Sequence, residues 1–177
     1  LKFKSLETKK IETLLNRQRP NLKKEEVKEL AVLSQGCPGR GIQLADQGGL
    51  ELYRQMVVLL NGLPKLDTTT VYTLGNQLSR SGEEQSFYLF MELLEGWIGR
   101  LVVFRTRSKT DTLNISPSGE EIKNSKIITN FKIDVLLDTY SKVISLTNQV
   151  EHLNLDRKLI FFEILSSLQG AFGGNCR

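Results

Sequence analysis

Apolar residues recur along this 177-residue chain in steps of three and four, which place them on one side of a helix. A strand would instead alternate apolar and polar residues at every second position. No such alternation, hairpin turn or internal repeat occurs, so the pattern predicts an all-α protein. The expected helices cover residues 6–17, 23–34, 38–47, 50–60, 68–78, 87–101, 130–151 and 155–168.

The three helices expected before residue 48 are short, and together they can bury only a modest core that needs neighbours for stability. The helix over 50–60 has a wide apolar stripe, which is typical of a connector buried on more than one side. We therefore expect a three-helix domain over residues 1–48 and a bundle of about five helices over 49–177. Gly48 is the preferred boundary, and Pro64 is the alternative.

Polar residues at the expected helix starts can accept hydrogen bonds from backbone N–H groups, so Ser5, Asp67 and Asn154 are predicted N-caps. In the last two helices, Leu137 and Leu155 belong to the stripes expected to face inward. Residues 106–125, between the expected helices over 87–101 and 130–151, are polar and predict a long surface loop.

The composition, with 40% hydrophobic and 25% charged residues, is that of a globular protein. No apolar run approaches the ~20 residues needed to span a bilayer, so we expect no membrane association. Two cysteines cannot form a disulfide framework, which favours a cytoplasmic protein. The chain starts without Met on an apparent strand end, which indicates a piece of a longer protein.

The net charge of +4 is concentrated at the start of the chain. Residues 1–40 hold ten Lys and Arg against five Asp and Glu, whereas the remainder is nearly balanced. One hypothesis is a stand-alone helical domain that binds nucleic acid through basic residues 2–24. A solvated helical face is the simpler interpretation, because no aromatic residues interleave with the basic ones to stack on bases.

A sharp corner is predicted between the second and third helices. Gly36 can end a helix in the left-handed conformation, and Pro38 suits the first position of the next helix. Gly39 and Gly41 leave the first turn bare, and Arg40 adds a positive charge to an N-terminus that already favours anions. The corner is therefore either a packing feature or an anion-contacting site.

Groups that carry chemistry are sparse. The sequence has no phosphate-binding loop of the G-x-x-x-x-G-K-[ST] type. The only histidine, His152, lacks the further ligands that a metal needs, and Cys37 and Cys176 lack the spacing of a zinc site. We expect no catalytic residue, no metal site and no cofactor within this chain.

The stretch from Ala31 to Arg54 reads AVLSQGCPGRGIQLADQGGLELYR. It resembles the lid region of the delta-prime family of bacterial DNA polymerase III clamp-loader subunits, whose members read like LSxGSPGRAL…GGLELYR. Residues 1–6 and 154–158 continue the resemblance, and the central portion is looser. It implies that residues 1–48 are an AAA+ lid and residues 49–177 a collar domain, without the nucleotide-binding core.

The resemblance also implies partners. Delta and gamma/tau subunits would bind through the collar. The complex would place a sliding clamp around primed DNA. It would use ATP that is bound at subunit interfaces by the AAA+ core, which this chain lacks. The parent would be a component of a DNA-directed DNA polymerase holoenzyme. Gly39 and Arg40 match the sensor-2 position, where other AAA+ proteins carry an arginine that reaches the ATP γ-phosphate. In subunits that hydrolyse ATP that arginine aligns with Gly39, and one residue turns a helical side chain by about 100°, so we expect no working sensor.

Overall fold

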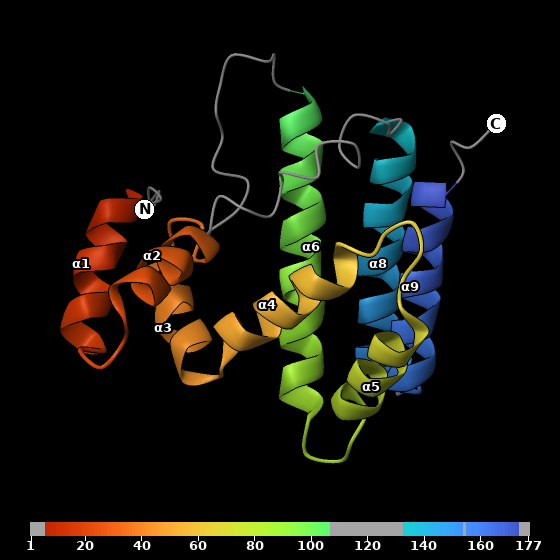
Figure 1. Ribbon diagram of the computed structural model, residues 1–177, viewed down its shortest axis with the longest axis horizontal. Helices are drawn as coiled ribbons and strands as arrows, with labels where there is room; N and C mark the ends of the chain where they lie inside the picture. Colours follow the sequence, from red (N-terminus) through yellow and green to blue (C-terminus); the bar gives the residue numbers. More distant parts are fainter. Residues whose placement is uncertain (1–5, 107–132, 154, 174–177) are drawn as a thin grey trace.

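The computed structural model describes residues 6–106, 133–153 and 155–173, and it contains eight α-helices and no strand within them. The prediction of an all-α fold is confirmed. Figure 1 labels the helices, whose bounds are α1 Thr8–Gln18, α2 Lys24–Leu33, α3 Pro38–Asp46, α4 Gly49–Leu60, α5 Thr68–Leu78, α6 Glu84–Thr106, α8 Ile133–Leu153 and α9 Arg157–Gly173.

Helix α6 stands at the centre of the molecule (Figure 1). The small bundle of α1, α2 and α3 lies on one side of it, and α5, α8 and α9 lie on the other. Helix α4 leads from the small bundle across α6, and it contacts α2, α3 and α6. A single apolar core joins all eight helices.

The sequence of α6 explains its central position. Its apolar side chains occupy most of the circumference rather than one stripe, which is the pattern of a helix buried on several sides. Five of these side chains have no measurable solvent exposure: Phe87, Phe90, Met91, Leu94 and Ile98.

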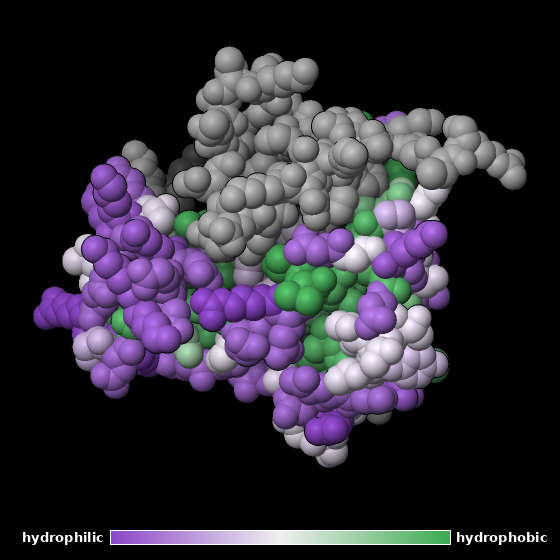
Figure 2. All heavy atoms as spheres, in the orientation of Figure 1, coloured by the Kyte–Doolittle hydropathy of each residue, from purple (hydrophilic) through white to green (hydrophobic). Residues whose placement is uncertain are grey.

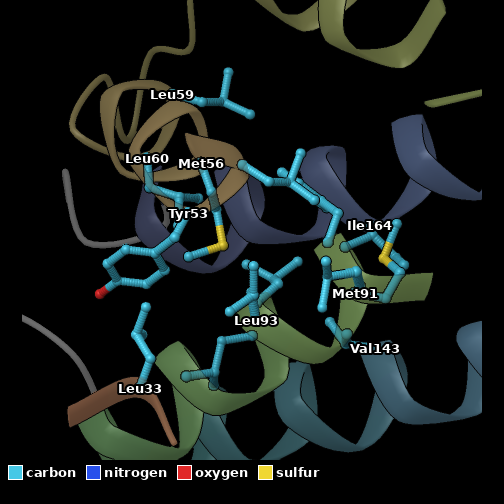
Figure 3. Packing of buried hydrophobic residues seen from close by; sticks show 14 of the residues in the cluster. Leu33, Tyr53, Met56, Leu59, Leu60, Met91, Leu93, Val143 and Ile164 are labelled. Atoms are coloured by element: carbon cyan, nitrogen blue, oxygen red, sulfur yellow. The ribbon is translucent and has the colours of Figure 1, made fainter. Parts of the chain in front are cut away.

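Helix α4 forms the connection between the two sides of the core. Gly48 precedes it with a φ of +67°, a conformation that favours glycine. Gly49 then approaches Leu44 so closely that a Cβ would lie 2.6 Å from that leucine's Cδ2. Tyr53 and Met56 are buried against α6 (Figure 3). The apolar core therefore continues across the predicted boundary at Gly48.

Two predicted helix starts differ from the structure. Helix α1 begins at Thr8 after Glu7 at the N-cap position, and the predicted cap Ser5 lies outside the described residues. Helix α9 begins at Arg157. The carboxylate of Asp156 accepts hydrogen bonds from the backbone N–H groups of Lys158 and Leu159, at 2.7 and 3.3 Å. Asp156 therefore caps α9, and Asn154, the predicted cap, lies outside the described residues.

Two leucines expected to face inward are exposed. Leu155 is 37% exposed because it precedes α9 and lies in the turn rather than on the helical face. Leu137 is 44% exposed, because α8 faces the core through Leu136 and Val143, and one residue turns a side chain by about 100°. The prediction was therefore wrong for both. Most of the predicted loop over 106–125 lies outside the described residues, and α6 continues to Thr106.

Candidate functional site

The corner before α3 has the predicted backbone conformation. Gly36 has a φ of +88°, and Pro38 is the first residue of α3. Gln35 also has a positive φ of +51°, which the sequence did not indicate. The side chain of Ser34, completely buried, donates a hydrogen bond to the carbonyl of Ala31 at 2.7 Å. These features fix the direction in which α3 leaves the corner.

Arg40 projects from that first turn toward α6. Its Nη2 lies 3.1 Å from Oε1 of Glu92, and its side chain is only 23% exposed. Its Nε is buried and has no hydrogen-bond partner among the described residues. Gly39, beside it, faces open space. The structure therefore directs the guanidinium of Arg40 to a carboxylate of the same chain.

Glu92 belongs to a row of three residues on one face of α6. Gly96 and Arg100 follow it at steps of four residues, which keeps them on the same side of a helix. A Cβ at Gly96 would lie 3.3 Å from Nε2 of Gln35, so the glycine leaves room for that amide. The Nη2 of Arg100 donates to the hydroxyl of Tyr53 at 3.2 Å, and the guanidinium lies 5.8 Å from the ring centroid.

Each residue of the row therefore meets a residue from the small bundle or from α4. We call this set the polar seam; it consists of Gln35, Arg40, Tyr53, Glu92, Gly96 and Arg100. Sequence analysis identified only Arg40. The available signal was the four-residue spacing of two charged residues and a glycine on one face of a largely apolar helix.

Glu95, next to the seam on α6, has a raised pKa. Burial is the main cause, because it disfavours the ionised carboxylate, and the nearby charge of Glu92 acts in the same direction. A hydrogen bond from Thr147 opposes both. The contact between α6 and α8 therefore contains a half-buried carboxyl group that binds its proton more tightly than usual.

Further ion pairs hold the small bundle together. Arg19 donates from Nε and Nη2 to both carboxylate oxygens of Asp46, at 2.7 and 2.6 Å, which lowers the pKa of Asp46 and raises that of Arg19. Arg54 on α4 lies 3.2 Å from Glu29 on α2. Within the basic N-terminal segment, the positive charge of Arg19 is thus balanced locally, as is that of Arg40 by Glu92.

The basic residues considered for nucleic-acid binding are spread over α1 and α2. Lys2 and Lys4 lie outside the described residues. Lys9, Arg17 and Lys24 are exposed, and acidic side chains such as Glu12 and Glu25 lie exposed or half-buried between them in the sequence. This arrangement is a mixed-charge surface.

A groove of about 390 Å³ lies between α4 and α5. Val58 and Leu74 supply its apolar part. In Figure 2 the face toward the viewer carries a green, apolar area over the C-terminal half of α4, next to paler atoms over α5. The lining residues are Glu51, Arg54, Gln55, Val58, Thr69, Thr70, Thr73, Leu74 and Gln77.

Within the part of the chain that the structure describes, no three His, Cys, Asp or Glu residues come together in a way that could hold a metal ion. His152 is exposed in the last turn of α8, and Cys37 is exposed before α3. None of the described helices combines the length and the apolar character needed to cross a membrane.

Comparison with known proteins finds no matching family model, no matching curated protein and no matching solved structure. The functional interpretation therefore depends on the residues of this chain and on their arrangement.

Proposed function

We propose that this chain is the lid and collar portion of a delta-prime subunit of the bacterial DNA polymerase III clamp loader. Its role is to assemble with delta and gamma/tau subunits in the complex that loads the sliding clamp onto primed DNA. In this proposal residues 1–48 form the lid and 49–177 the collar. ATP acts at the level of the complex, through an AAA+ core that is not part of this chain.

One observation carries the proposal. The stretch that resembles the family, Ala31–Arg54, forms the corner, α3 and the start of α4, and these elements join the small bundle to the larger one. A lid that passes movement to a collar needs such a connection. Here α4 contacts both the small bundle and α6, and in this proposal it is the element through which the lid acts on the collar.

The environment of Arg40 supports a structural rather than a phosphate-binding role for the sensor-2 position. Its guanidinium already pairs with Glu92 on α6, at 3.1 Å. To reach a nucleotide it would have to give up that contact. This agrees with a subunit that does not hydrolyse ATP and acts through assembly. In this proposal Arg40 and Gly39 occupy the sensor-2 position without binding the γ-phosphate.

Purified chain mixed with delta and gamma/tau subunits on a sizing column tests the proposal. We expect co-elution in one peak at low and moderate salt. The matched control uses the chain with Arg40→Met and Glu92→Gln, which removes the seam ion pair but not the collar helices, and it should still co-elute. Separate elution of the unmodified chain would contradict the proposal.

Binding of the chain alone to primed DNA, in the absence of other subunits, provides a second readout. An affinity that falls steeply with salt, combined with no binding to the subunits, would favour the nucleic-acid hypothesis instead. The mixed-charge surface of α1 and α2 leads us to expect no such binding.

A further inference from the structure

The turn that follows α4 contains Asn61–Gly62, the only Asn–Gly pair in the sequence, and both residues are exposed. Such a pair can react with itself, because glycine has no side chain to hinder its backbone nitrogen. That nitrogen bonds to the side-chain carbonyl carbon of the asparagine, the bond from this carbon to the amide nitrogen breaks, and ammonia leaves with the glycine N–H proton. Water then opens the five-membered imide at either carbonyl group, which gives aspartate or isoaspartate. Water is the only reagent that the conversion needs.

The structure holds this pair in a helical conformation. Asn61 directly follows the last residue of α4, and its φ of −63° and ψ of −18° continue the winding of that helix. Its N–H donates to the carbonyl of Val57 at 2.9 Å, and the N–H of Gly62 donates to the carbonyl of Leu59 at 3.1 Å. Both reacting residues are therefore hydrogen-bonded parts of the end of α4.

This conformation opposes ring closure in two ways. The glycine nitrogen must lie on the same side of the asparagine Cα–C bond as Cβ, whereas a ψ of −18° places it almost over the backbone nitrogen of Asn61. The reaction also requires Gly62 to lose its N–H proton, and the hydrogen bond to Leu59 retains that proton. The pair is thus exposed to water but held in an unreactive geometry.

Rotation to a reactive ψ requires the turn to open. A Cβ at Gly62 would lie 3.2 Å from the backbone oxygen of Leu59 and 3.3 Å from that of Lys65, so the glycine is closely surrounded by backbone. The side chains of Leu63 and Leu66, 5% and 9% exposed, then fix the following segment to the core. An opening of this turn is a local event that does not require the whole chain to unfold.

The products do not fit the closed turn. Isoaspartate carries the main chain through the side-chain carbon, which adds a backbone atom directly before the enclosed Gly62. Both products also place a carboxylate at the C-terminal end of α4, where the helix dipole disfavours negative charge. Conversion therefore favours the open form of the turn from which it arose.

We propose that Asn61 is a latent modification site, at which deamidation and isoaspartate formation occur only after the turn between α4 and α5 has opened. The modification then acts in one direction, because the isoaspartate form cannot close the turn again. The inference concerns the chain alone and does not depend on the proposed clamp-loader role.

Peptide mapping by mass spectrometry tests the proposal on the full chain, incubated at mildly alkaline pH below its unfolding transition. Conversion at Asn61 should be at least about tenfold slower than in the same chain unfolded in guanidinium chloride. Guanidinium concentrations too low to change the circular dichroism should already speed it, because local opening precedes global unfolding. Equal rates in the folded and unfolded chain, or a rate that rises only with global unfolding, would overturn the proposal.

Two buried leucines provide matched variants. Leu66→Ala removes a side chain that fixes the turn, and it should speed conversion at Asn61 at least about threefold. Leu15→Ala removes a completely buried side chain of α1, far from the turn in the sequence, and should leave the rate unchanged wherever its circular dichroism shows a folded chain. An equal acceleration in both variants would contradict opening of the turn as the controlling step.

The isolated isoaspartate form tests the second half of the proposal. Its backbone amides over residues 61–66 should exchange with deuterium at least about tenfold faster than those of the unmodified chain, while those of α1 stay as protected as before. Unchanged protection over residues 61–66 would show that the modified turn closes, and would overturn the one-way character of the site.

Discussion

Arg40, in the first turn of α3, pairs with Glu92, in the middle of α6, across a distance of 3.1 Å. The two residues are 52 positions apart in the sequence (92 minus 40), and they belong to opposite sides of the predicted domain boundary at Gly48. Gln35, which lies close to Gly96, joins this pair in connecting the small bundle to the central helix, and the hydrogen bond from Arg100 to Tyr53 connects α4 to it. The guanidinium at the corner before α3 is thus engaged in a contact within the chain.

A double-mutant cycle measures that pair. Arg40→Met and Glu92→Gln, singly and together, should show a coupling of about 0.5–1 kcal/mol in urea unfolding at low salt. The value is modest because Glu92 is 48% exposed. At about 1 M salt the coupling should shrink further, because screening weakens exposed charge pairs. Additive single effects at low salt would show that the pair contributes nothing.

Gly49 and Gly39 provide a matched pair of glycines. Gly49→Ala should destabilise the fold by about 1–3 kcal/mol, because its Cβ would lie 2.6 Å from Cδ2 and 3.1 Å from the backbone oxygen of Leu44. Gly39→Ala has open space around it and should change stability by less than about 0.5 kcal/mol or raise it slightly. Thermal and urea unfolding measure both. Equal effects of the two substitutions would contradict the described approach of α3 and α4.

Tyr53→Phe should cost about 0.5–1.5 kcal/mol, because Arg100 loses its acceptor while the buried ring stays in place. Tyr72→Phe is the control. Tyr72 is 54% exposed, so removing its hydroxyl leaves no buried group without a hydrogen-bond partner. Urea unfolding of both variants checks the prediction. A larger effect from the exposed tyrosine would be incompatible with the seam.

The raised pKa of Glu95 has a consequence for stability against pH. The folded chain binds this proton more tightly than the unfolded chain, so the contribution of Glu95 to stability is greatest at low pH and is lost as the pH rises above about 4.5. Glu95→Gln stays neutral and lacks this loss. Relative to the unmodified chain, the variant should therefore gain stability between pH 4 and pH 7 as the pH is raised. Parallel pH profiles would contradict the burial of this carboxyl.

Local chemistry was predictable from the sequence. Gly36 takes its left-handed conformation and Pro38 begins α3 because these preferences depend only on neighbouring backbone. Asp67 likewise caps α5, and its carboxylate accepts the N–H of Thr70 at 2.7 Å. The helical period of α6 also identified most of its buried residues, but it missed Leu89 and Leu93, and Trp97 is only partly buried.

Features that depend on distant residues were not predictable. The stripe of α8 includes Leu137 by period alone, and only the positions of α6 and α9 decide that Leu136 faces the core and Leu137 does not. The same holds for the polar seam, because nothing local to Glu92 or Arg100 indicates that α3 and α4 lie opposite. The groove likewise needs α4 and α5 to lie next to each other, which no local signal in either helix indicates.

The central claim is that this chain acts by binding sister subunits of a clamp loader. The most direct measurement is the affinity of the purified chain for the gamma/tau and delta subunits, by titration calorimetry at moderate salt. The account predicts saturable binding with a dissociation constant of about 1 µM or lower. Absence of heat and of complex formation with either subunit would contradict it.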